Sequence, residues 1–193
     1  MGIMKEFLKS FKSFETIFKT GVRFEERSQG PRGELFLKLY ENGLLIKEYN
    51  QHNIIVNTAS ILIARLLKDS TEPSAGISYL GVGSGNASWD YMDPPAPTTS
   101  QTLLENEFDR KAIELTTFVD PETGEPIETP TNIVDYSVTY GEAEGVGPIM
   151  ELSLFGGDAT ESIDSGTMVN WRTFPVINKT NSMTLTVIFR ITT

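Results

Sequence analysis

An apolar period of two residues constrains the fold of this chain more than any other feature of its sequence. The segment 182–192 repeats it longest, with apolar residues at alternate positions: Met183, Leu185, Val187, Phe189 and Ile191. The same alternation recurs in 34–40, 132–140 and 148–155. Successive side chains of a strand point to opposite faces, so the pattern predicts antiparallel sheet with one buried face. Ile188 lies on the otherwise polar face of 182–192, and we assign it to a subunit contact.

Two further signals complete the expected domain. Asn42-Gly43 separates two strand-like segments, and this dipeptide is the strongest short signal for a hairpin turn. Apolar residues at helical spacing predict one helix near 58–69, with Pro73 beyond its end. We therefore expect a mainly β fold, an antiparallel β-sandwich with one inserted helix, over residues 31–193.

The N-terminal segment follows a different period. Apolar residues recur at spacings of three and four in 3–19 and predict an amphipathic helix whose stripe includes Phe7, Phe11, Phe14 and Phe18. Such a helix can lie on a membrane, dock on another protein or pack on its own domain. Glycines and Pro31 follow it, and its polar face carries glutamates as well as lysines. We therefore expect residues 1–30 to form a separate docking helix and linker that binds a partner protein.

The glycine-rich stretch YLGVGSGN, residues 79–86, raises the question of a nucleotide site. A dinucleotide-binding loop needs a sixth-position glycine and a following helix, but Asn86 and a proline-rich segment stand there. A P-loop needs Gly-Lys-Ser/Thr, and no lysine occurs between Lys68 and Lys111. We interpret these glycines as architectural, allowing a strand to end in a tight turn close to neighbouring backbone.

Composition excludes several function classes. The net charge of −10 disfavours a nucleic-acid binder held by phosphate contacts. The absence of cysteine excludes disulfides, thiolate metal sites and cysteine nucleophiles. No segment approaches the roughly 20 apolar residues of a membrane-spanning helix. We therefore expect neither nucleic acid nor a membrane as the partner.

Two stretches of the sequence resemble structural proteins of tailed bacteriophages. In the first, a strand ending in Gly-x-Gly is followed by a Pro/Thr loop and a "T-x-L-x-x-E-x-x-R" pattern. The second resembles "E-x-G-L-F … G-T-x-x-x-R-x-x-F-P-x-I-x-K-T … L-T-V-x-W-x-I", with Ser153 and Phe189 departing from it. The matching residues are Gly81, Gly83, Thr102, Leu103, Glu105, Glu107, Arg110, Glu151, Leu154, Phe155, Gly166, Thr167, Arg172, Phe174, Pro175, Ile177, Lys179 and Thr180. The resemblance covers roughly residues 34–193 and extends to tail, fibre-attachment and head-decoration subunits.

Residues that could carry chemistry lack the context that a reaction needs. His52 is the only histidine, and we interpret it as a loop residue after the hairpin, since no nucleophile motif accompanies it. Glu105, Glu107 and Asp109 alternate and would share a strand face, either solvated or paired with Arg110 or Lys111. The acidic residues of the loop 156–166 do not have the spacing of an EF-hand; they are Asp158, Glu161 and Asp164. We expect no enzymatic activity, no cofactor and no metal.

The resemblance implies a non-enzymatic, multi-copy virion protein that decorates or links head, neck or tail components. A specific form of this role is the anchoring of a fibre. The protein would be assembled in the host cytoplasm and contact other virion proteins and copies of itself, with Trp171, Arg172 and Ile188 as candidate interface residues. One alternative is a carbohydrate-binding β-sandwich, in which Trp89, Tyr91 and Trp171 stack on sugars. A less favoured alternative is a carbohydrate-degrading tail component, which would need two facing carboxylates.

Overall fold

The computed structural model describes residues 30–68 and 75–193, and in these ranges the chain is mainly β with one helix. The predicted docking helix, with Phe7, Phe11, Phe14 and Phe18, lies outside the described residues. The elements are β1 (Arg32–Glu41), β2 (Leu44–Ile55), α2 (Asn57–Lys68), β3 (Ala75–Gly83), β4 (Glu107–Ala112), β5 (Leu115–Val119), β6 (Pro126–Ile127), β7 (Ile133–Tyr140), β8 (Gly147–Gly157), β9 (Thr167–Met168), β10 (Asn170–Lys179) and β11 (Met183–Thr192). The predicted mainly β class with one inserted helix is confirmed.

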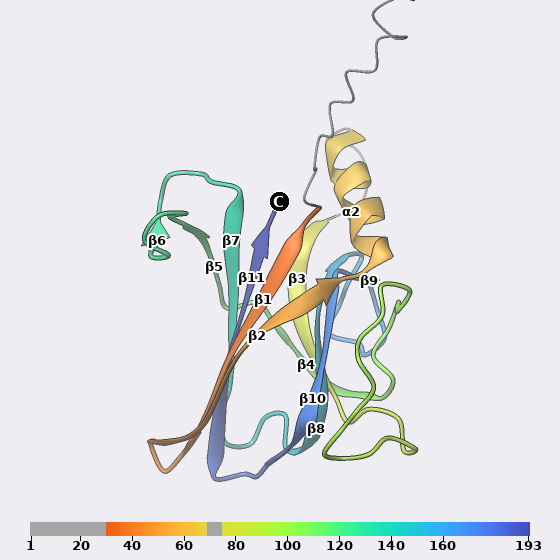
Figure 1. Ribbon diagram of the computed structural model, residues 1–193, viewed down its shortest axis with the longest axis vertical. Coiled ribbons are helices and arrows are strands. Elements are labelled where there is room, and N and C mark those ends of the chain that lie inside the picture. Colours follow the sequence, from red (N-terminus) through yellow and green to blue (C-terminus); the bar gives the residue numbers. More distant parts are fainter. Residues whose placement is uncertain (1–29, 69–74) are drawn as a thin grey trace, which may run out of the picture.

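All strand pairs are antiparallel and form one sheet in the order β4-β3-β8-β10-β2-β1-β11-β7-β5-β6, while β9 pairs with β8. The sheet is open, because β4 and β6 are edge strands. Its two halves are joined where the end of β2 pairs with the start of β10, through Ile55 with Asn170 and Ile54 with Trp171. Figure 1 shows β2 crossing from the β1 side to the β10 side, with α2 and the β1–β2 hairpin at opposite ends.

The apolar core draws on both halves of the sheet. One cluster contains Leu37 and Val187 from the β1–β11 half and Leu80 and Leu152 from the β3–β8 half, all fully buried. One apolar cluster therefore includes buried residues from both halves of the sheet. Ala59 and Leu62 of α2 join the same cluster, which fixes the helix over one end of the core.

Several local predictions are confirmed. Asn42 and Gly43 have positive φ values of 50° and 78°, as the two central residues of a hairpin turn require. Successive residues of β11 alternate between buried and half-buried positions as expected, with Phe189 fully buried and Ile188 partly exposed. The inserted helix begins at Asn57, one residue before the predicted start. No helix among the described residues is long and apolar enough to cross a membrane.

The alternation in β8 predicts that only one face of this strand is buried, and this prediction is wrong. Met150, Leu152 and Leu154 are buried as expected, but Glu151 and Ser153 are also fully buried. The second face is covered because hydrogen bonds tie the loop after β3 and the start of β10 to this strand. A strand with polar alternate residues is therefore enclosed on both sides.

Candidate functional site

The glycine stretch at the end of β3 makes room for two buried carboxylates. A Cβ atom on Gly81 would lie 2.5 Å from Oε1 of Glu107, and one on Gly83 would lie 2.6 Å from Oε1 of Glu151. The Gly83 position also faces the backbone oxygen of Asn106, at 3.0 Å from such a Cβ. Neither glycine has a positive φ value, so the requirement is space rather than backbone conformation. The predicted close approach to neighbouring backbone is present at Gly83, but at both positions the nearest atoms belong to side chains.

Glu151 is the centre of a buried hydrogen-bond network behind this stretch. Its Oε1 accepts bonds from the backbone N–H groups of Gly85 and Asn106, at 3.2 and 3.0 Å. Its Oε2 accepts bonds from the backbone N–H of Glu105 and from Nε1 of Trp171, at 3.1 and 3.0 Å. Burial raises the pKa of the carboxyl above its ordinary value, and these hydrogen bonds partly offset the rise. One side chain thus holds two loop segments and β10 against β8.

The same loop is fixed by two tryptophans. Gly85 has a φ value of +69°, and a Cβ at this position would collide with the ring of Trp89. The rings of Trp89 and Trp171 lie 6.3 Å apart, centroid to centroid. Trp171 is only 3% exposed. Of the three aromatic residues proposed as sugar-stacking groups, only Tyr91 is freely accessible, at 63% exposure.

A second buried charge network holds the loop between β8 and β9. Arg110 Nη2 donates to Glu107 Oε2 over 2.7 Å, and both side chains are almost fully buried. Arg110 Nη1 bonds the carbonyl and hydroxyl oxygens of Ser165, at 3.0 and 2.8 Å. Glu107 Oε2 also accepts from the backbone N–H of Asp164 at 2.8 Å, and the guanidinium lies over the Phe155 ring at 4.6 Å from its centroid. Glu107 therefore pairs with Arg110, one of the partners that the sequence suggested.

Lys179, at the end of β10, likewise binds backbone groups of a neighbouring turn. Its ammonium donates to the carbonyl oxygens of Gly141 and Glu144, over 2.6 and 2.7 Å, and the residue is buried. Burial lowers the pKa of this lysine. The ammonium thus holds the turn between β7 and β8 in place.

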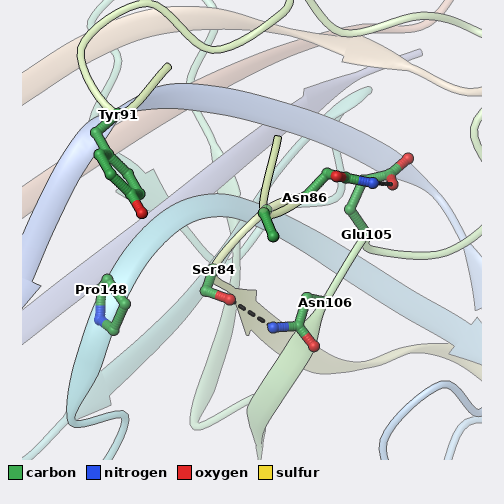
Figure 2. A pocket seen from close by; sticks show the side chains of 8 residues that line it. Ser84, Asn86, Tyr91, Glu105, Asn106 and Pro148 are labelled. Carbon is green, nitrogen blue, oxygen red and sulfur yellow. Dashed lines mark hydrogen bonds between the residues drawn. The ribbon is translucent and has the colours of Figure 1, made fainter. Parts of the chain in front are cut away.

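An open hollow of about 470 Å³ lies beside the glycine stretch. Figure 2 shows Tyr91 and Pro148 on one side of it, Asn86, Glu105 and Asn106 on the other, and Ser84 between them. The volume falls within the range of about 300–1,000 Å³ that is typical of small-molecule sites. Its lining combines the polar side chains of Ser84, Asn86, Glu105 and Asn106 with Tyr91 and Pro148.

Exposed apolar side chains gather at two other places. The tip of the β1–β2 hairpin presents three consecutive ones, Leu44, Leu45 and Ile46, and Leu44 is 71% exposed. On α2, Ile61, Leu66 and Leu67 are exposed, Leu67 to 80%. Apolar patches of this kind on a protein surface commonly mark contacts with other proteins.

The three predicted interface residues differ in their exposure to solvent. Trp171 is buried inside the chain, whereas Arg172 and Ile188 are partly exposed. Ile188 pairs with Phe36 of β1, which is also partly exposed, so an apolar pair lies on the outer face of this half of the sheet. Arg172 donates to the carbonyl oxygen of His52 and to the Gln51 side chain.

The other candidate groups lie apart from one another. His52 lies within β2 rather than in a loop, which corrects the prediction; its side chain is 86% exposed, and its Nδ1 is 3.8 Å from Glu34 Oε1. Glu105 precedes β4, so it does not share a strand with Glu107 and Asp109. In the described ranges, no three His, Asp or Glu side chains come together as a metal site would require, and this includes Asp158, Glu161 and Asp164.

Sequence reasoning considered Asn86, Tyr91 and Glu105 separately, for other reasons, and did not bring the residues of the hollow together. They come from three separate segments, around 84–91, 105–106 and 148, and no local spacing signals their meeting. Comparison with protein-family models and with curated protein sequences finds no match for this chain.

Proposed function

We propose that this chain is a non-enzymatic structural protein of a tailed-bacteriophage virion, present in several copies. In this role it decorates or links head, neck or tail components. A specific form of the role is the anchoring of a fibre. The chain is assembled in the host cytoplasm and contacts other virion proteins and copies of itself. Its finer fold is a β-sandwich, a description supported by the larger of two core clusters, to which both halves of the sheet contribute.

One observation carries the proposal. The described residues contain four buried charged side chains, Glu107, Arg110, Glu151 and Lys179, and all four belong to the phage-like sequence patterns. Each of them bonds backbone groups of a loop or turn. The patterns thus specify how loops are attached to a sheet, as expected for a family that shares a scaffold rather than a reaction.

The surface supports an assembly role. The hairpin tip and the outer side of α2 present apolar side chains to solvent, and the Phe36–Ile188 pair is partly exposed. The acidic net charge of −10 keeps the free subunit soluble until its apolar surfaces are covered. The predicted N-terminal docking helix would add an attachment to a partner component.

The experiment is sedimentation equilibrium of the full chain over a range of concentrations. We expect the wild type to self-associate and Ile188→Ser to associate more weakly, with unchanged urea unfolding of the monomer. Thr186→Ser is the matched control, because it changes the same face of β11 but keeps a hydroxyl. A wild-type protein that stays monomeric, or an Ile188→Ser variant that associates as well as Thr186→Ser, would contradict this assignment of the interface.

A further inference from the structure

The hollow beside the glycine stretch has a rigid frame. Its floor is held by Glu151, which accepts bonds from the backbone of Gly85 and Asn106. The loop that carries Tyr91 is tied to β10, since the backbone N–H of Val176 donates to the carbonyl oxygen of Tyr91 over 2.8 Å. A ligand would therefore meet a surface that is ordered before binding, which reduces the entropy cost of association.

The polar side chains of the hollow hold one another in place. Nδ2 of Asn106 donates to Oγ of Ser84 over 2.6 Å, and Nδ2 of Asn86 donates to Oε2 of Glu105 over 3.3 Å. Oε1 of Glu105 accepts a further bond from Nε2 of Gln101 over 3.0 Å.

These bonds leave several groups available to a ligand. The side-chain oxygen of Asn106 and the hydroxyl of Tyr91 make no hydrogen bond within the described chain. The hydroxyl hydrogen of Ser84 and further lone pairs of Glu105 are also available, since each of these groups can form more bonds than it makes here.

The chemistry of the lining narrows the ligand class. No lysine or arginine lines the hollow, and Glu105 adds a negative charge, which disfavours phosphates, sulfates and other anions. A single lining carboxylate is too few for a cation site of hard oxygen ligands. A purely apolar ligand would leave the amide and carboxylate groups without partners.

A neutral sugar satisfies all of these conditions. Its hydroxyls donate to Glu105 and to the oxygen of Asn106 and accept from Ser84 or Tyr91. The C–H face of a pyranose ring packs against an exposed aromatic ring such as that of Tyr91. We propose that this hollow is a binding site for a neutral hexopyranose unit of an oligosaccharide, with Tyr91 as the stacking platform and Ser84, Glu105 and Asn106 as the hydroxyl-binding groups.

The test measures binding of the full chain to three neutral probes, cellohexaose, maltohexaose and mannohexaose, and to one anionic probe, a heparin hexasaccharide. Isothermal titration calorimetry gives the affinity. The side-chain amide signals of Asn86 and Asn106 in ¹⁵N-correlated NMR spectra report the place of binding. We expect saturable binding of at least one neutral probe with a Kd of about 1 mM or tighter, shifts of both amide signals, and no binding of the anionic probe.

Three variants localise the site. Tyr91→Ala should weaken binding about tenfold or more, whereas Tyr91→Phe keeps the ring and should lose less than about threefold. Met92→Ala is the matched control, since Met92 is an exposed residue of the same loop that does not line the hollow, and it should bind like the wild type.

Absence of saturable binding by all three neutral probes would overturn the proposal. So would wild-type affinity in folded Tyr91→Ala, or preference for the anionic probe. The test of self-association uses Ile188→Ser and sedimentation, whereas this test uses Tyr91 variants and oligosaccharide binding. Failure of either test is therefore distinguishable from failure of the other.

Discussion

Replacement of Glu151 by glutamine tests the buried network that ties three segments to β8. The two side chains have nearly the same shape, so the change removes one acceptor oxygen and adds an NH₂ donor. In the wild type, each carboxylate oxygen accepts two N–H groups. Whichever way the Gln amide turns, its NH₂ group faces two N–H donors, and both lose their acceptor in a buried place.

The magnitude follows from these two donors. Each buried donor left without a partner costs about 1–3 kcal/mol, which gives about 2–6 kcal/mol for the pair. A neutral amide costs less to bury than a carboxylate, and burial already raises the pKa of Glu151, so part of this loss is regained. We therefore expect Glu151→Gln to lower the free energy of unfolding by about 2–4 kcal/mol, a large share of the roughly 5–15 kcal/mol of a typical domain.

The assay is equilibrium unfolding in guanidinium chloride, followed by tryptophan fluorescence and by far-ultraviolet circular dichroism. Glu161→Gln serves as the control, because this carboxylate is exposed and the same chemical change there should alter stability by less than about 0.5 kcal/mol. The dependence of the unfolding free energy on denaturant should stay the same in both variants. If Glu151→Gln is as stable as Glu161→Gln, the carboxylate does not hold the loops, and our description of the network is wrong.

Three further substitutions test neighbouring parts of the scaffold. Gly83→Ala should cost about 1–3 kcal/mol in thermal unfolding through overpacking, while Gly76→Ala, which meets open space, should cost far less. Tyr140→Phe should cost about 1 kcal/mol at neutral pH in urea unfolding. Burial raises the pKa of Tyr140 well above 10.0. The stability that its protonated hydroxyl contributes is therefore complete below pH 10 and is lost as the pH rises through the folded-state pKa. The Phe variant should lack this pH-dependent loss of stability. Lys179→Met should accelerate amide hydrogen exchange in residues 141–146, and unchanged exchange would show that the ammonium does not hold this turn.

The parts of the fold that the sequence predicts are those with a local cause. The hairpin follows from Asn42 and Gly43 because both adopt positive φ values, which these residue types tolerate. The buried face of β11 follows from alternation alone, since each strand residue points opposite to its neighbour.

The parts that it does not predict depend on distant segments. Glu151 and Ser153 have the pattern of solvent-facing residues, yet the 84–106 loop and β10 cover them. Trp171 looked available for an interface or a sugar, but it is buried and bonds Glu151, which lies 20 residues away in the sequence. The hollow around Tyr91 likewise depends on how the loop closes, which no spacing within the loop reveals.

The most direct test of the proposed virion role is quantitative mass spectrometry of density-gradient-purified phage particles from infected cells that express this chain. The account predicts several copies of the protein per particle, in a fixed ratio to the major capsid protein across independent preparations. A protein that is abundant in the infected-cell lysate but absent from purified particles would contradict it.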